Sequence, residues 1–308
     1  MGRSELLSIC IVNWNTRELL RACLASLAAH PPALEHEVLV ADNASADGSA
    51  ALVAAQFPWV RLIETGANLG FAEGNNRLLR LARGDWLLLL NPDTEIVPEL
   101  DPRPLDTLVD HLRANRQVGA VSARLVQPDG VTQRSCRGFP TPLALAAEWT
   151  GLARLFPRVL GGYRLRAFDH ESARPVPQPM ASCLLLRRAA LRGVGLFDPR
   201  FPIFFNDVDL CLRLHQAGWR RDYQPAASIL HLGGGTTRLV KPAMVRESRD
   251  ALLAFYAKHY RRALHPLVYA ATVAAIRMAF WLRLAWVTRA VSQPSGAREG
   301  GAAPSARG

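Results

Sequence analysis

Short apolar runs that end in a carboxylate or an amide recur along the first hundred residues of this chain. The run from Trp86 to Leu90 holds four consecutive leucines and is followed by Asn91, Pro92 and Asp93. A strand this apolar is typical of a parallel sheet covered on both faces, and such sheets bind ligands at the carboxyl ends of their strands. A carboxylate placed there can hold a divalent cation, which in turn holds a diphosphate. The alternative is an ordinary Pro-Asp turn.

Strand-like runs alternate with helical patterns over this part of the chain. The runs cover residues 6–12, 38–41, 60–63, 86–90 and 118–122, and helical patterns cover residues 16–29, 49–57 and about 71–82. Asn15 is the expected N-cap of the first helix, with Glu18 three residues on. This alternation predicts crossover units, and therefore an α/β fold with a mostly parallel sheet flanked by helices.

Polar side chains follow these runs. Asn15 comes after the first run, Asp42 ends the second, and Asn68 and Asn76 bound a stretch that contains two glycines. Each residue also has a purely structural interpretation. Asp42 is well placed for a turn with its own backbone, and one of the two amides is well placed to fix the loop.

A second polar motif lies late in the chain. Asn206, Asp207 and Asp209 begin a helical pattern that closes at Gly218, and Asp207 is either a reactive carboxylate or the cap of that helix. His231 follows an apolar run and precedes three glycines. A histidine beside a strand is often structural, although glycines behind it allow the backbone to fold over phosphates.

Taken in this order and at these spacings, the motifs resemble glycosyltransferase family 2, the inverting nucleotide-sugar enzymes of GT-A fold. The likeness is greatest to the rhamnosyltransferase-type branch, and it runs from about residue 6 to residue 237. It implies a catalytic domain over residues 1–237, with a nucleotide-binding half at about 1–98 and an acceptor half at about 99–237. The irregular stretch 134–179, rich in proline and glycine, is expected to cover the sheet and shape the acceptor site.

The resemblance assigns roles to the nucleotide-binding half. Asp42 is implied to contact the nucleoside, with Asn15 on the neighbouring strand end, and Asn68 and Asn76 are implied to bind ribose or sugar. Asp93 is the counterpart of the last carboxylate in the family's Asp-x-Asp metal motif. It is implied to hold Mg²⁺ or Mn²⁺ together with the substrate phosphates.

The remaining roles belong to Asn91, Asp207 and His231. Asn91 stands at the first position of the metal motif, a variant that leaves Asp93 as its one carboxylate. Asp207 is implied to be the general base. The family usually has Glu-Asp where this chain has Asn206-Asp207, so the proton acceptor is kept and its acidic neighbour is lost. His231 resembles the family's late histidine, which reaches the metal or the diphosphate.

Charge is concentrated at the end of the chain. The net charge is +11, and the residues from 238 onward hold 12 basic and 3 acidic side chains, or +9. A nearly neutral body with a basic end argues against nucleic acid and for an anionic membrane surface or an acidic partner. Five cysteines without CxxC spacing, and no early run long enough for a signal peptide, predict a cytoplasmic protein, at the inner face of the membrane.

Two helices are expected beyond residue 242, the second from 266 to about 289, followed by a disordered tail from 293. The charge-free part of the second helix, residues 266–276, is shorter than the ~20 residues that span a bilayer. Trp281 and Trp286 with flanking arginines suit a membrane interface. The alternative, a helix packed on the catalytic domain or a partner chain, stays open.

The sequence therefore predicts a metal-assisted inverting glycosyltransferase for cell-envelope polysaccharide, which moves a sugar from a nucleoside diphosphate to a glycan or lipid-linked acceptor. One rival is a sugar-phosphate nucleotidyltransferase, whose usual early loop of glycines and basic residues is missing near residues 13–17. The other is a catalytically degenerate, membrane-associated binding module. Asn206 favours that module, whereas the intact Asp93, Asp207 and His231 argue against it.

Overall fold

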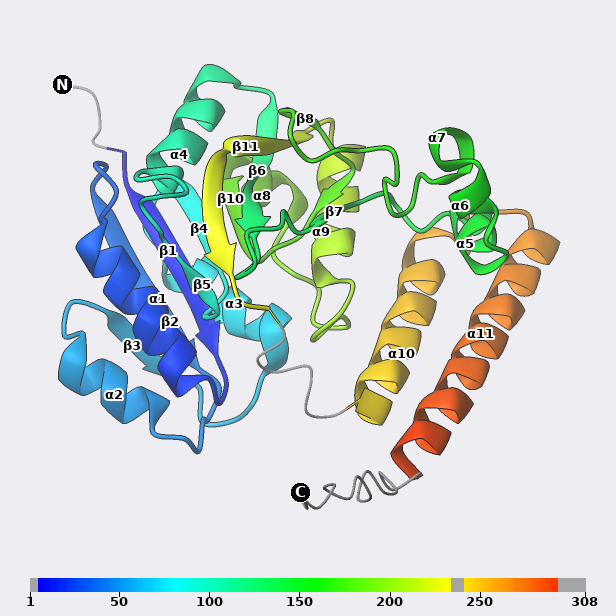
Figure 1. Cartoon of the computed structure of the whole chain (residues 1–308), viewed down its shortest axis with the longest axis horizontal. Coiled ribbons are helices and arrows are strands. Elements are labelled where there is room, and N and C mark those ends of the chain that lie inside the picture. Colours follow the sequence, from blue (N-terminus) through cyan, green and yellow to red (C-terminus); the bar gives the residue numbers. More distant parts are fainter. Residues whose placement is uncertain (1–4, 234–240, 293–308) are drawn as a thin grey trace, which may run out of the picture.

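A computed structural model describes residues 5–233 and 241–292. Within them the centre is a nine-stranded mixed sheet ordered β3-β2-β1-β4-β10-β6-β11-β5, with β8 paired to β11 (Figure 1). The strands are β1 Leu7–Asn13, β2 His36–Asp42, β3 Arg61–Glu64, β4 Trp86–Leu90, β5 Thr94–Glu95, β6 Val118–Val126, β8 Arg174–Pro175, β10 Cys183–Arg187 and β11 Arg220–His231.

The sheet confirms the predicted α/β class. The strands β3, β2, β1 and β4 are parallel neighbours, and β6 and β11 form a second parallel pair. Between the two groups lies β10, which is antiparallel to both β4 and β6. The carboxyl ends of the parallel strands therefore meet the start of β10 at one edge of the sheet.

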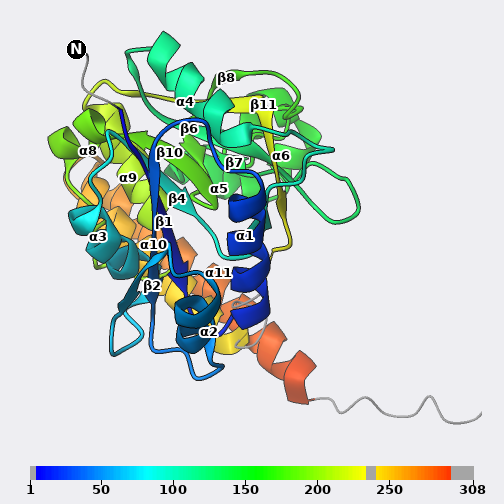
Figure 2. The ribbon, with the colours of Figure 1, turned by 90° about the vertical axis from the view of Figure 1, so that its left-hand side faces the viewer.

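Six helices cover the two faces of the sheet. One face carries α1 Arg17–Ala29, α2 Ser49–Gln56 and α4 Pro104–Ala114, and the other carries α3 Gly70–Leu81, α8 Arg188–Val194 and α9 Asn206–Gln216 (Figure 2). The leucines of β4 alternate between these layers, because Leu88 and Leu90 pack with α1 and Leu87 and Leu89 pack with α3. Burial on both faces explains why this strand is continuously apolar.

One local prediction was wrong, and one helix was not predicted. Thr16, not Asn15, is the N-cap of α1, and Asn15 has a φ of 52°. The first turn of α1 is instead satisfied by Asp47, whose Oδ2 accepts a hydrogen bond from the Arg17 amide at 2.8 Å. The helix α4 was not predicted, although Pro104 stands at its first turn and its leucines recur at helical spacing.

The irregular stretch 134–179 contains small elements only. They are β7 Cys136–Arg137, α5 Pro142–Trp149, α6 Leu152–Leu155, α7 Pro157–Leu160, β8, and β9 Gln178–Pro179. This stretch was expected to cover the sheet. Its three helices instead lie beside α11, away from the sheet (Figure 1). The strands β7, β8 and β9 return to the catalytic body, and Phe168 and His170 pack on Tyr223 of β11.

The chain ends in two long helices, α10 Lys241–His259 and α11 Pro266–Ser292. Lys258 on α10 reaches Asp198 at 2.7 Å and Asp209 at 2.5 Å, and His259 reaches the same Asp209 at 2.7 Å. Phe255 and Tyr256 are buried against the residues before and within α9. Ion pairs and apolar burial thus fix α10 to the catalytic body, and the predicted tail from residue 293 lies outside the described residues.

All five cysteines are buried and free. Burial raises the pKa of the Cys10 and Cys183 thiols to about 12, because the thiolate would have to leave water. These thiols are packing groups inside the sheet layers.

Candidate active site

Most of the predicted site residues lie at the carboxyl edge of the sheet. Asn13 ends β1 opposite Asp42, which ends β2. β4 runs parallel to β1, and Asp93 follows it in the turn to β5. His231 ends β11 and pairs with Thr94 of β5. The strand register therefore brings residues from four parts of the sequence to one edge, which is where α/β sheets bind ligands.

Asp42 is held in a network that also serves the backbone. Its Oδ1 accepts a hydrogen bond from Asn13 Nδ2 at 2.8 Å, and its Oδ2 accepts one from the Ser45 amide at 2.9 Å. Asp42 therefore makes the backbone hydrogen bond expected from its structural interpretation. Each carboxylate oxygen keeps a further acceptor position, so contact with a nucleoside stays a prediction.

Asn15 and Asn68 lie on the exposed rim of this edge. Asn15 Oδ1 accepts a hydrogen bond from the Ala46 amide at 2.8 Å, which ties the end of β1 to the loop after β2. Asn68 Oδ1 accepts one from the Gly70 amide at 3.0 Å and so forms a turn before α3. Both residues keep free amide donors toward solvent, and their ligand contacts remain predictions.

Asn76 is placed differently, because its side chain is buried in the catalytic body. Its Nδ2 donates to the Phe197 carbonyl at 2.9 Å, and its Oδ1 accepts from the Phe197 amide at 2.9 Å. This pairing fixes α3 to the loop that leads toward α9. The observed contacts of Asn76 therefore fit the alternative in which one of the two amides fixes the loop. The predicted contact of Asn76 with sugar remains untested.

Gly70 permits a close approach of α3 to protein. It has a φ of +73°, and a Cβ at this position would lie 2.8 Å from the Pro202 carbonyl oxygen. That oxygen accepts hydrogen bonds from the Phe71 and Ala72 amides, so it caps α3 from the segment before α9. The two halves of the catalytic domain are joined here.

We expect Gly70→Ala to destabilise the protein more than Gly66→Ala. Gly66 has a similar φ of +75° with open space around it, so alanine there meets backbone strain alone, about 1–2 kcal/mol. At position 70 the clash with Pro202 should add roughly 1–3 kcal/mol. Thermal unfolding of both variants measures the difference. Equal melting temperatures would contradict the close contact.

Asp93 and His231 face each other without a hydrogen bond. Asp93 Oδ1 lies 3.3 Å from His231 Nε2, and both atoms are buried and unpaired among the described residues. The other ring nitrogen, Nδ1, lies 2.7 Å from Gln133 Oε1. An amide oxygen can only accept, so in the neutral imidazole Nδ1 carries the proton and Nε2 presents its lone pair to Asp93.

Two acceptor atoms at this distance fit a divalent cation between or beside them, since carboxylate oxygen and neutral imidazole are metal ligands. Among the residues that the structure describes, no group of three or more His, Cys, Asp and Glu side chains converges. Water and substrate oxygens would therefore complete the coordination, as is common for Mg²⁺ bound with phosphates.

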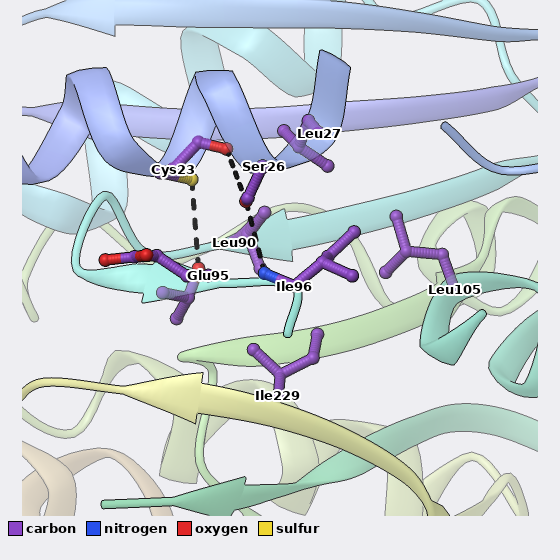
Figure 3. Close-up of a pocket in the computed structure, with 9 residues that line it drawn as sticks. Cys23, Ser26, Leu27, Leu90, Glu95, Ile96, Leu105 and Ile229 are labelled. Atoms are coloured by element: carbon purple, nitrogen blue, oxygen red, sulfur yellow. Dashed lines mark hydrogen bonds between the residues drawn. The ribbon is translucent and has the colours of Figure 1, made fainter. Parts of the chain in front are cut away.

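The turn that carries Asp93 is fixed by α1. The hydroxyl of Ser26 accepts a hydrogen bond from the Ile96 amide at 3.1 Å (Figure 3). The Cys23 thiol also points at the Asn91 carbonyl oxygen, 3.8 Å away. A small apolar pocket between these elements leaves no room for a water molecule. Asn91 is turned toward β10, where its Nδ2 donates to Ser182 Oγ at 3.2 Å. Asp93 thus stands on a rigid support.

Asp207 begins α9 on the other side of Ser182. Its Oδ2 accepts a hydrogen bond from Gln178 Nε2 at 2.8 Å, and backbone amides of Val208 and Ala181 also donate to it. Burial outweighs these bonds and raises the pKa of the Asp207 carboxyl to about 6. A carboxylate with a pKa near neutrality is suited to accept a proton in a reaction.

Asn206 has a structural task that a glutamate could not perform. Its side chain is buried, and its Nδ2 donates a hydrogen bond to the Ile203 carbonyl at 2.6 Å. This bond stabilises the turn in which Phe205, two residues before Asp207, has a φ of 66°. A glutamate has no donor for that carbonyl when ionised. Asp209, two residues further along, pairs with an arginine, because Arg213 Nε lies 2.8 Å from its Oδ2.

The segment Ala181–Ser182 links the two halves of the site. Ser182 bonds Asn91, two residues before Asp93, and Ala181 bonds Asp207. Sequence reasoning missed Asn13, Gln133 and Gln178, which orient Asp42, His231 and Asp207. Asn13 is a polar residue at the end of an apolar run, which is the pattern that selected the other site residues. The two glutamines lie in irregular segments, where no such pattern marks them.

Comparison with known proteins agrees with this geometry. The family model described as glycosyl transferase family 2 matches residues 8–192, more than half of the chain. The chain belongs to glycosyltransferase family 2. As a member of this family it is a glycosyltransferase, and the sheet and the flanking helices are those of the GT-A fold.

Individual relatives of this family 2 chain agree as well. The chain is 34% identical over 243 residues to N-acetylglucosaminyl-diphospho-decaprenol L-rhamnosyltransferase of Mycobacterium tuberculosis, which covers 74% of this chain and 76% of the relative. Among solved structures it is similar to the mannosyltransferase PcManGT from Pyrobaculum calidifontis in complex with GDP-Man and Mn²⁺, with a TM-score of 0.56, 18% identity and 95% and 77% of the two chains covered. Staphylococcus aureus TarS 1–349 with UDP gives 0.53, 15% identity, and 88% and 70% covered.

Proposed function

We propose that this chain is a metal-assisted, inverting glycosyltransferase that uses Asp207 as general base. The observation that carries the metal assignment is the buried, unpaired couple of Asp93 Oδ1 and His231 Nε2, 3.3 Å apart. A divalent cation, Mg²⁺ or Mn²⁺, bound there would neutralise the diphosphate leaving group. Asp42, Asn15, Asn68, Asn76 and Asn91 are proposed to bind or frame the nucleotide sugar.

The proton transfer is assigned to Asp207. Its carboxylate accepts the proton of the acceptor hydroxyl while that oxygen bonds the anomeric carbon, and the bond to the diphosphate breaks on the opposite side. The anomeric centre is thereby inverted. Gln178 holds the carboxylate through Oδ2, and Val208 holds it through Oδ1. A pKa of about 6 keeps the base ionised at neutral pH and close to the optimum for accepting a proton.

The substrate class is proposed from the most informative relative. The mycobacterial enzyme transfers L-rhamnose to N-acetylglucosaminyl-diphospho-decaprenol, according to its name. We propose L-rhamnose or a related hexose from a nucleoside diphosphate as donor, and a sugar on a lipid diphosphate as acceptor. Such an acceptor places the enzyme at the cytoplasmic face of an anionic membrane, in the synthesis of cell-envelope polysaccharide.

A donor panel tests this proposal. Purified protein is incubated with nucleotide sugars, Mn²⁺ or EDTA, and a short-chain lipid-diphosphate N-acetylglucosamine, and nucleoside diphosphate and product are measured by mass spectrometry. We expect one or a few donors to be consumed only with metal, and the new linkage to be inverted. In a parallel incubation with a nucleoside triphosphate and a sugar phosphate, release of pyrophosphate would support a nucleotidyltransferase. Binding of donor without turnover would support the degenerate module.

Gln133 offers a narrower test of the metal site. Gln133→Leu removes the acceptor that keeps the proton on His231 Nδ1, and we expect Mn²⁺ affinity to fall roughly tenfold or more, as for other partners behind a metal ligand. Titration calorimetry with Mn²⁺ and unreactive nucleoside diphosphate measures this without turnover. Gln133→Glu keeps an oxygen acceptor and should retain the affinity. An unchanged affinity in Gln133→Leu would remove His231 from the metal site.

A further inference from the structure

The end of the molecule formed by α5–α7 and α11 exposes many large apolar side chains. On α5–α7 these are Leu143, Trp149, Leu152, Leu155, Phe156 and Val159, and on α11 they are Leu267, Val268, Met278, Trp281, Leu282 and Trp286. Val159 is 81% exposed and Trp281 is 64% exposed. α5 packs beside α11, and α5–α7 lie near the start of that helix (Figure 1). We call this region the α5–α7/α11 surface.

The exposed side chains of α11 lie on one face of the helix. Tyr269, Ile276 and Phe280 form the packed stripe that meets Phe255 and Tyr256 of α10. Leu267, Leu282 and Trp286 are exposed away from this stripe. Met278 and Trp281 are also exposed, and they border a groove toward Arg249, Asp250 and Leu253 of α10. Exposed apolar side chains gathered in this way mark an interaction site.

Charge identifies the partner. From Tyr260 to Ser292 the chain has five arginines and no acidic residue. The stretch 142–166 has four arginines and one acid, Glu148, which is occupied by Arg164 and Arg166 at 3.3 and 2.7 Å. Arginines and tryptophans around an apolar face suit an anionic lipid surface. A second copy of this chain would place arginines against arginines, which opposes such a dimer.

The orientation of α11 indicates that this helix lies in the membrane–water interface and does not cross the bilayer. By length and composition the stretch Pro266–Val287 passes as a membrane span, with a mean hydropathy of 1.5, although its charge-free run had argued against one. However, its packed stripe lies along α10, and α10 is tied to Asp198 and Asp209 through Lys258 and His259. A helix held along a charged helix on one side can bury only its other side in lipid.

We propose that α5–α7 and the outer face of α11 form one docking surface for anionic membrane, with α11 parallel to the bilayer plane. The inference deepens the proposed membrane contact, on which it rests. It adds α5–α7 as a second lipid-contacting element, from a part of the sequence where we had expected an acceptor-site cover. A lipid-linked acceptor would then reach an enzyme already held at the surface that contains it.

Vesicle flotation with full-length protein tests the surface, in the absence of any substrate. The protein should bind vesicles of phosphatidylcholine mixed with phosphatidylglycerol and be partly released by salt, and should bind phosphatidylcholine alone far less. Val159→Glu and Trp281→Glu should each lower binding about tenfold or more, because each removes apolar contact and adds a charge that the headgroups repel. Replacing Arg154 or Arg158 by Gln should lower it roughly fivefold.

Two exposed residues elsewhere serve as matched controls. Val131→Glu and Trp59→Glu make the same changes at sites 55% and 45% exposed, outside the α5–α7/α11 surface, and should leave binding unchanged. Normal binding by Val159→Glu would exclude α5–α7. If the protein forms a dimer without lipid and Trp281→Glu dissociates it, the surface binds a second copy of this chain. If the membrane-bound protein resists extraction with alkaline carbonate, α11 crosses the bilayer. Either result overturns the proposal. Vesicle flotation does not depend on sugar transfer. A negative donor panel therefore does not change what the flotation result says about membrane binding.

Discussion

Asp207→Asn should lower sugar transfer by roughly 10²-fold or more while leaving the protein folded. Asparagine fits the same space and caps a helix about as well as aspartate, so the structural role survives. It cannot accept the hydroxyl proton, and general base catalysis contributes about 10²–10⁴-fold. Initial rates with saturating donor and acceptor measure the loss. Near-normal turnover would leave Asp207 with the structural role alone.

The melting temperature of this variant should change by only a few degrees, because two effects oppose each other. Asparagine has one acceptor oxygen, so it keeps either the Gln178 or the Val208 bond. Against that, the buried charge is removed. A carboxyl whose pKa is raised from 3.8 to about 6 in the folded state loses stability as pH rises through that window, and the neutral amide avoids this loss.

The pH profile of the wild-type enzyme follows from the same shift. The base acts only when ionised, so turnover should fall as pH drops through about 6, well above the range of an ordinary aspartate. If turnover instead fell only near pH 4, the catalytic base would be a group other than Asp207.

Asp209, two residues along α9, is a matched control. It is fully buried among Arg213, Lys258 and His259. Burial raises its pKa, but the hydrogen bonds from His259 and Lys258 outweigh it and hold the pKa below the ordinary value. Asp209→Asn should therefore lower the melting temperature more than Asp207→Asn does, while the folded fraction keeps its turnover. The two variants separate stability from catalysis on one helix.

The parts of the fold that follow from sequence are those that depend on local patterns. Four leucines in β4 required burial on both faces, and the polar residues that end β1, β2 and β4 had to share an edge once those strands were parallel. Asp93 and His231 could also be selected from the sequence, since each follows an apolar run. Resemblance supplied their roles.

What the sequence could not supply depends on contacts between distant segments. Gln133 and Gln178 lie in irregular backbone, and only tertiary structure places them on His231 and Asp207. The position of α5–α7 beside α11 likewise follows from packing against α10. Asn206 was interpreted as a loss, whereas its bond to Ile203 explains it as a donor that the turn uses.

Asp93→Ala should reduce transfer by roughly 10³-fold, because a bound cation contributes several kcal/mol of charge stabilisation and each 1.4 kcal/mol is tenfold. Mn²⁺ binding should weaken in parallel, since the variant leaves His231 as the single side-chain ligand of the pair. Donor binding, measured by calorimetry with and without EDTA, should become independent of metal. The fold should persist, because the turn is held by Ser26 and the Asn91 carbonyl rather than by the Asp93 side chain.

Asp85→Ala is the control for loss of a carboxylate at the other end of the same strand. Asp85 precedes β4 and contributes its backbone carbonyl to Arg188, so its side chain lies at the amino edge of the sheet. This variant should keep metal-dependent donor binding and turnover. If Asp93→Ala also kept them, the unpaired oxygen facing His231 would be a buried polar defect, and the cation would have to bind elsewhere. Asp93 therefore decides whether the carboxyl edge of this sheet is the catalytic centre.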